Sequence, residues 1–153
     1  MKLAEALAQR ADLQARLVHI ANRAQQSARY QEGEEPAEDA NALLAQYDRL
    51  AEDLTSLIVR INTRNLATEV EPGFSMTAAL ALRDALKQRH RMRTELANAA
   101  AEPRDRFTRT ELRSIPAVNV RTLRDEADAL AAQLRALDTR IQEVNWTTEM
   151  ESE

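Results

Sequence analysis

Histidine is the most versatile catalytic and metal-binding side chain that this sequence of 153 residues offers, because it contains two histidines and no cysteine. The di-iron pattern of helical bundles requires a Glu-x-x-His step on two helices. Here His19 follows Arg16 by three positions and His90 follows Lys87. We therefore interpret both histidines as packing or surface residues, and the sequence predicts neither a metal site nor a cofactor.

Other catalytic patterns do not assemble either. Gly33 and Gly73 are isolated, so no glycine-rich loop that could cradle a phosphate is formed. The sequence also has no recognisable Ser-His-Asp or Cys-His set. We expect a protein that is not an enzyme.

Two charged stretches of opposite sign are the strongest candidates for an interaction. The stretch "QEGEEPAED" carries five carboxylates and no base, and these belong to Glu32, Glu34, Glu35, Glu38 and Asp39. The stretch "PRDRFTRTELR" is basic, and its candidate residues are Arg104, Arg106, Phe107, Arg109 and Arg113. The two stretches either pair with each other, within one chain or between chains, or remain two solvated loops.

The basic stretch has an alternative interpretation. Arginines around Phe107 could hold the phosphates of a nucleic acid or a nucleotide. The formal net charge of the chain is −4, so the protein as a whole has no attraction for a polyanion. Nucleic acid is therefore the less favoured partner, although this stretch keeps it open.

An internal repeat shows which elements position these stretches. "LLAQYDRLAEDLTSLIVRINTRNLATEVE" at 43–71 returns as "LRDEADALAAQLRALDTRIQEVNWTTEME" at 123–151, with twelve identities in twenty-nine positions. Apolar residues in both copies step alternately by three and four, which is typical of helices that pack in a coiled-coil manner. A weaker match joins the segments before them at a shift of 73, as in Leu13 and Leu86. The repeat unit is therefore a helical hairpin, present twice.

We expect helices near 2–29, 39–66, 76–101 and 119–145, with Asp39, Ser75 and Asn119 as N-caps and "EPG" at 71–73 as the break between hairpins. Aromatic residues make up 3% of the chain and glycine occurs twice, which favours helices over strands. The predicted fold is all-α: an antiparallel four-helix bundle made of two duplicated hairpins, approximately 3–71 and 76–151, in a single domain, 1–153.

Arginine occupies the same seam position in both copies of the repeat, at Arg10 and Arg83. Antiparallel folding places Arg10 opposite the region of Ile58, and it places Arg83 opposite 135–138, where Asp138 is a plausible partner. We interpret these residues as a structural polar seam that fixes the register of the helices, with an anion site as the alternative.

The third helix has an ambiguous packing face. After Leu86 its seam continues with His90 and Arg93, while Leu82, Met92 and Leu96 lie on a neighbouring stripe. A helix with apolar residues on two stripes often faces a second subunit as well as its own core. This pattern predicts a homo-oligomer.

The location of the protein is indicated by what the chain lacks. The start, "MKLAEALAQRADLQARL", is interrupted by Glu5, Arg10 and Asp12, so it has no apolar core of a signal peptide. No window approaches the roughly 20 apolar residues of a membrane span. With the absence of cysteine, these features favour a cytoplasmic protein without a membrane partner.

Several strings of the sequence resemble a small bacterial helical family of uncharacterised proteins, some of which carry the label septicolysin. The resemblance covers nearly the whole chain, and it rests on "MKLAEAL", "RADLQ", "QEGEEPAED", "DRFTRTEL" and "LDTRIQEVNW". It implies an all-helical fold and brings no catalytic residues. The label implies a membrane-lytic toxin, which remains the third hypothesis behind a self-assembling interaction protein and a phosphate-binding one.

Overall fold

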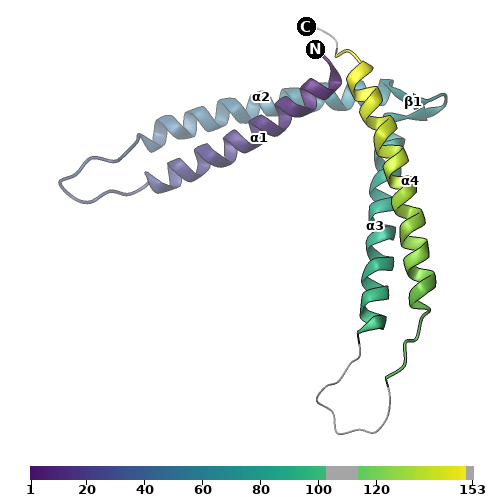
Figure 1. Cartoon of the computed structure of the whole chain (residues 1–153). Coiled ribbons are helices and arrows are strands. Elements are labelled where there is room, and N and C mark those ends of the chain that lie inside the picture. The colour runs from purple at the N-terminus through teal and green to yellow at the C-terminus, as the bar shows by residue number, and fades with distance from the viewer. Residues whose placement is uncertain (103–113, 151–153) are drawn as a thin grey trace. The chain divides into compact units, whose positions relative to one another are not determined.

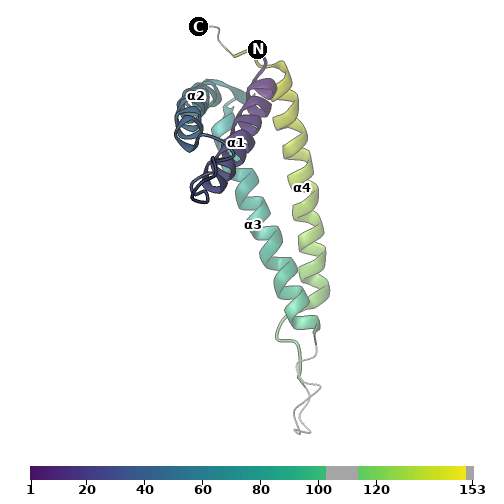
Figure 2. The ribbon, with the colours of Figure 1, turned by 90° about the vertical axis from the view of Figure 1, so that its left-hand side faces the viewer.

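The protein contains four long helices in the part of the chain that the structure, a computed structural model, describes, which is residues 1–102 and 114–150. In chain order the elements are α1 (Leu3–Gln26), α2 (Ala40–Ala67), β1 (Glu69–Glu71), β2 (Phe74–Ser75), α3 (Met76–Ala101) and α4 (Val120–Thr147). Helix α1 lies beside α2, and α3 lies beside α4 (Figures 1 and 2). The predicted all-α class, with four helices paired as two hairpins, is confirmed. We call α1 with α2 hairpin 1, and α3 with α4 hairpin 2.

The three predicted N-caps are confirmed. The side chain of Asp39 accepts hydrogen bonds from the backbone N–H groups of Asn41 and Ala42, at 2.9 and 3.3 Å. Ser75 Oγ accepts from Ala78 N at 3.2 Å, and Asn119 Oδ1 accepts from Thr122 N at 3.0 Å. These bonds satisfy backbone donors that have no partner within the helix, and they fix where α2, α3 and α4 begin.

The connection between the hairpins differs in detail from the prediction. The break at 71–73 contains the last residue of β1 and the turn that joins it to β2 in a short two-stranded ladder, and Gly73 in this turn has a φ of 77°. Only glycine adopts this conformation without strain, so the turn is fixed by sequence. The strands themselves are too short to give a periodic signal. Helix α1 also ends earlier than predicted, at Gln26.

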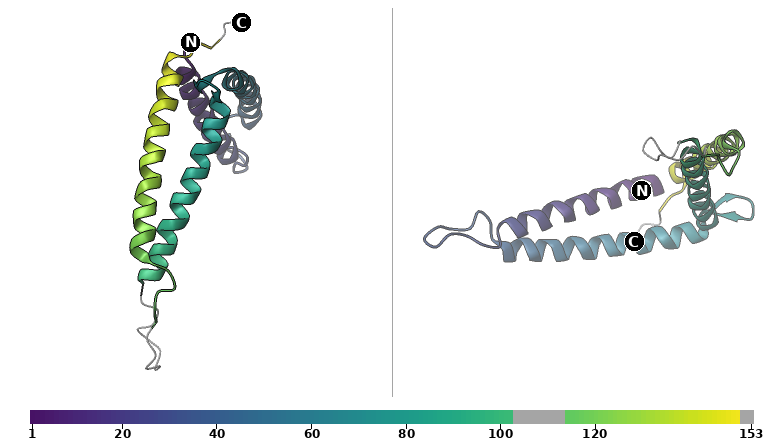
Figure 3. Two further views of the ribbon diagram at one scale, coloured as in Figure 1. Left: turned by 90° about the vertical axis from the view of Figure 1, so that its right-hand side faces the viewer. Right: turned by 90° about the horizontal axis from the view of Figure 1, so that it is seen from below.

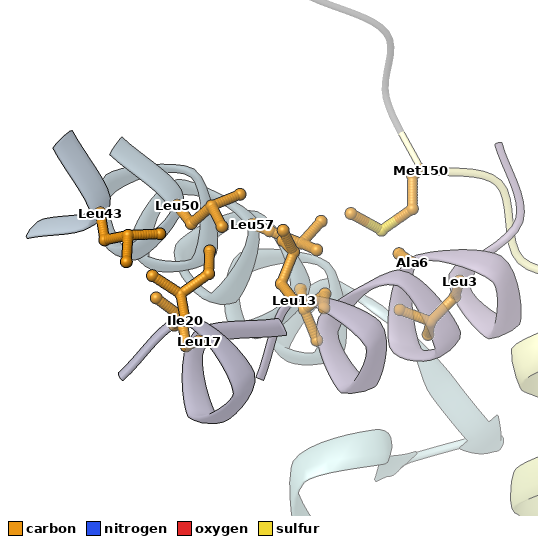
Figure 4. Close-up of a cluster of buried hydrophobic side chains, with 10 residues drawn as sticks. Leu3, Ala6, Leu13, Leu17, Ile20, Leu43, Leu50, Leu57 and Met150 are labelled. Carbon is orange, nitrogen blue, oxygen red and sulfur yellow. The ribbon is translucent and has the colours of Figure 1, made fainter. Parts of the chain in front are cut away.

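The core of hairpin 1 is a continuous line of buried apolar side chains between its two helices. Figure 4 shows Leu13, Leu17 and Ile20 of α1 facing the leucines of α2. Met150 packs into the same cluster beside Ala6, and it is held there because Met150 N donates to Met1 O at 2.8 Å. Lys2 and Glu149 form an antiparallel bridge next to it. The segment after α4 therefore completes the core of hairpin 1.

Hairpin 2 has a similar seam with fewer large apolar residues. Its two helices run side by side, as Figure 1 and the left view of Figure 3 show. Met76, Ala79 and Leu86 of α3 are buried, as are Leu130 and Ile141 of α4. Farther along, toward Ala101, the seam becomes polar: His90 is half-buried, and Arg93 Nε donates to Glu126 Oε2 at 2.7 Å.

The helix boundaries agree with the register of the repeat. Helices α1 and α3 begin 73 residues apart, and α2 and α4 both begin and end 80 residues apart. By contacts the chain divides into two compact units, Val70–Gln142 on one side and Met1–Glu69 with the segment from Glu143 onward on the other. The prediction of a single domain stays a prediction.

Candidate interaction surface

The acidic loop of hairpin 1 contains residues with two different tasks. Glu32, Glu34 and Glu35 are exposed. Glu38 instead accepts a hydrogen bond from Arg23 Nε at 2.9 Å and pairs with Arg23 a second time through Nη2. These hydrogen bonds lower the pKa of Glu38 below its usual value and raise that of Arg23. Because Asp39 caps α2, three of the five predicted acidic residues remain available for a partner.

The basic candidates lie outside the described residues. Arg104, Arg106, Phe107, Arg109 and Arg113 all fall within 103–113. The predicted pairing of the acidic and basic loops therefore stays a prediction, and so does binding of phosphates by the basic loop.

Arg83 and Asp138 of the predicted polar seam lie together in hairpin 2. Arg83 Nη1 is 3.8 Å from Asp138 Oδ1, and Nε is 3.6 Å from Asp84 Oδ1. The guanidinium is half-buried, and its Nε forms no hydrogen bond among the described residues. Two carboxylates at ion-pair distance thus compensate a partly buried charge.

Arg10 occupies the equivalent position of hairpin 1 without an equivalent acid. Its Nε is buried and has no hydrogen-bond partner in the described part of the chain. At the position that matches Asp138, hairpin 1 has Ile58. The two seam arginines therefore share a place in the repeat but not an electrostatic environment.

Helix α3 carries a second, outward-facing line of residues, which we call the outer stripe. Its members are all exposed and recur alternately at four and three positions: Ala78, Leu82, Ala85, Arg89, Met92, Leu96 and Ala99. The exposed fractions of Leu82, Met92 and Leu96 are 44%, 58% and 36%. This spacing is that of a coiled-coil seam. The sequence had identified the three large residues, but the alanines and Arg89 complete the heptad pattern and had been missed.

The same stripe of α1 is polar. At a shift of 73, the residues equivalent to the outer stripe are Glu5, Gln9, Asp12, Arg16, His19, Arg23 and Gln26. Several of them are engaged within their own unit, such as Arg16 with Asp12 at 3.9 Å. A helical hairpin of this kind therefore does not need an apolar outer stripe. This comparison between the two repeats is the signal that could have identified the stripe from sequence.

A shallow apolar groove continues the outer stripe at the end of hairpin 2. It has a volume of about 450 Å³, and its lining includes Leu96 and Ala99 of α3 with Ile115 and Val118 from the segment before α4. Ile115 is 82% exposed. The apolar surface thus extends from the outer stripe onto the neighbouring segment.

Within the described part of the chain, neither histidine belongs to a cluster of metal ligands. His19 is exposed and His90 is half-buried. Among residues 1–102 and 114–150, no group of three or more His, Asp or Glu side chains is arranged to hold a metal ion. In the same part of the chain, no helix is long and apolar enough to cross a membrane.

The fold and this surface define a class of protein: an all-α chain of two duplicated helical hairpins with one exposed heptad stripe. A family model described as "Family of unknown function (DUF6847)" matches residues 10–150, and the chain belongs to this family. The chain is also similar to a solved structure, the crystal structure of a functionally unknown conserved protein from Corynebacterium diphtheriae. The two share 36% identity over 99% of each chain, with a TM-score of 0.92.

No curated protein sequence matches the chain. Neither of the two matching descriptions carries the label septicolysin, so the comparisons do not support that part of the resemblance. The expected kinship with bacterial helical proteins of unknown function is confirmed.

Proposed function

We propose that the protein is a non-enzymatic self-assembly module and that the outer stripe of α3 is its contact surface. The supporting observation is the exposure of Leu82, Met92 and Leu96 at coiled-coil spacing on a helix whose other seam is already buried. Contiguous exposed apolar surface of this kind marks interaction sites. The polar stripe of α1 supports the proposal further, because the repeat itself does not account for the apolar residues.

The energy available sets the expected strength of assembly. Fully burying a Leu or Met side chain contributes about 1.5–3 kcal/mol. The three large residues are already about half buried, so a symmetric contact would gain roughly 1 kcal/mol from each of the six that two copies supply. This gain is comparable with the lower end of the cost of association, about 4–15 kcal/mol. We therefore expect a weak, reversible oligomer.

Sedimentation and light scattering over a wide concentration range, about 1 to 500 µM, test the proposal. The mass of the unchanged protein should rise with concentration from that of the monomer, 17.3 kDa. Replacing Leu82, Met92 and Leu96 together with Gln should keep the protein monomeric, since Gln retains helix propensity while removing the apolar surface. Circular dichroism verifies that the variant remains helical.

The matched control is the double variant Leu44→Gln and Val59→Gln. Both residues are on α2, they are 55% and 59% exposed, and polar residues such as Asp48 and Thr55 separate them. This variant removes exposed apolar side chains that lie outside the outer stripe, and it should assemble like the unchanged protein. A protein that stays at 17.3 kDa throughout, or a control that dissociates as fully as the triple variant, rules the proposal out.

A further inference from the structure

The outer stripe of α3 has the same spacing in both directions from Leu82 to Ala99. Its steps there are three, four, three, four and three, so reversing the helix brings every one of these positions opposite another one. Resting on the proposed function, we propose that α3 pairs with α3 of a second copy in antiparallel orientation, about a two-fold axis between Arg89 and Met92. Such a contact is closed, because the same patch serves both subunits.

Side-chain size favours the antiparallel register. It sets Leu82 opposite Ala99 of the second copy, Ala85 opposite Leu96, and Arg89 opposite Met92. Each leucine then meets an alanine and the two long side chains meet beside the axis, so no layer pairs two leucines or two alanines and the distance between the helices stays even. A parallel register would instead place Met92 on Met92 and Ala85 on Ala85, so that one layer is crowded and the other leaves a gap. The stripe is thus complementary to its own reverse.

The border of the stripe on the solvent side also suits a second copy. Ala81, Gln88 and Glu95 precede the stripe residues Leu82, Arg89 and Leu96. Glu95 already accepts a hydrogen bond from Arg91 Nε at 2.6 Å, and in the antiparallel register it is far from Glu95 of the second copy, because the two lie on opposite sides of the axis. No like charges therefore meet along this border.

Arg89 is the charged residue of the outer stripe, and its charge limits the strength of the contact. In α1 the equivalent Arg16 has Asp12 one turn earlier, but at that place α3 has Ala85. Arg89 forms no ion pair with any described residue. The two Arg89 side chains lie in the two layers next to the two-fold axis, and the repulsion between their guanidinium groups weakens the assembly. Arg89 therefore keeps the oligomer reversible, and removing its charge should strengthen assembly.

Disulfide trapping tests the orientation, because the chain has no cysteine and each probe is then unique. Ala85→Cys and Leu96→Cys are made as separate proteins with tags of different mass, and Lys87→Cys, on the opposite side of α3, serves as the control. Oxidation of the mixed Ala85→Cys and Leu96→Cys proteins should give several-fold more cross-linked dimer than either protein alone or the control, since opposite Cβ atoms lie within disulfide reach.

Three outcomes overturn the pairing, and they separate it from the proposed function. Cross-links dominated by each variant with itself indicate a parallel contact. A protein that forms oligomers but cross-links no better than the Lys87→Cys control assembles through another surface. A protein that is monomeric at every concentration removes both the pairing and the self-assembly module.

The role of Arg89 has its own measurement. Arg89→Gln should lower the dissociation constant several-fold, opposite to the usual effect of an interface substitution. A mixture of the unchanged protein with Arg89→Glu should form mixed dimers more readily than either forms its own, because opposite charges then meet beside the axis. Equal dissociation constants for the unchanged protein and Arg89→Gln would place Arg89 away from the axis and refute the antiparallel register.

Discussion

Hairpins 1 and 2 share a repeat register, but they distribute their apolar residues differently toward the loop ends. In α1 the seam continues from Leu13 through Leu17 and Ile20, all buried. In α3 the seam that starts with Leu86 continues with polar residues at the equivalent places, while large apolar side chains occupy the outer stripe. Compared with hairpin 1, hairpin 2 therefore has less apolar packing in its seam and more exposed apolar surface on the corresponding helix.

This difference shows what a helical hairpin requires and what it leaves free. In each hairpin, the half farther from the loop keeps buried residues that match between the repeats, such as Ile61 and Ile141. The half toward the loops tolerates an ion pair, Arg93 with Glu126 at 2.7 Å, in place of apolar contacts. Because the first half supplies the packing, the second half of hairpin 2 is available for recognition.

The largest expected effect comes from removing the matched core residues. Ile61→Ala and Ile141→Ala each truncate a side chain that is 1% exposed, and each should cost about 2–4 kcal/mol of unfolding free energy. If the two compact units unfold separately, each variant should lower one of two transitions in urea denaturation followed by circular dichroism. A single transition shifted equally by both variants would show that the hairpins unfold as one cooperative unit.

The repeat made much of the fold predictable. Twelve identities between 43–71 and 123–151 fixed two helices in register, and Asp39, Ser75 and Asn119 marked helix starts because their side chains satisfy free backbone donors. The ladder of β1 and β2 was not predictable, since two or three residues carry no periodicity. The burial of Met150 in hairpin 1 depends on tertiary contact and has no local signal.

The surface was predictable in part. The sequence indicated that Leu82, Met92 and Leu96 lie off the seam, and from this pattern we predicted a homo-oligomer. The sequence could not decide which of the two stripes of α3 faces α4, because both have heptad spacing and both include arginine. Only the burial of Met76, Ala79 and Leu86 distinguishes them.

A smaller effect is expected for the seam arginines, and it sharpens the comparison of their surroundings. Arg83 and Asp138 are 3.8 Å apart with side chains 25% and 41% exposed, so solvent screening limits their interaction. A double-mutant cycle with Arg83→Met and Asp138→Asn should give a coupling of about 0.5–1 kcal/mol. The same cycle with Arg10→Met and Ile58→Asn in hairpin 1 is the control, and it should give no favourable coupling because no acid lies there.

Coupling that is equal in the two hairpins would contradict this account. It would mean that the guanidinium groups are stabilised by features common to both repeats rather than by Asp138. Coupling confined to hairpin 2 would identify Asp138 as the residue that distinguishes the two seams.

The smallest effect concerns Glu38, which pairs with Arg23. Arg23 of α1 is the residue equivalent in the repeat to Leu96 in the outer stripe of α3. Hydrogen bonding from Arg23 lowers the pKa of Glu38 in the folded protein. A carboxyl whose folded pKa is depressed stabilises the fold above its unfolded pKa, about 4.3, and this contribution is lost as the pH falls through the lower folded value. Hairpin 1 should therefore lose a small increment of thermal stability in this acidic window.

An NMR titration of the Glu38 carboxyl carbon measures the pKa directly, and melting curves at several acidic pH values measure its consequence. Glu38→Gln keeps the side-chain shape and one acceptor but cannot titrate, so the melting temperature of this variant should depend less on pH in the same window. A Glu38 carboxyl that titrates at or above the usual value would show that the pair with Arg23 does not persist in solution. Arg23 would then be free for a partner, and the polar outer stripe of hairpin 1 would become a second candidate surface, one that recognises charge where α3 recognises apolar side chains.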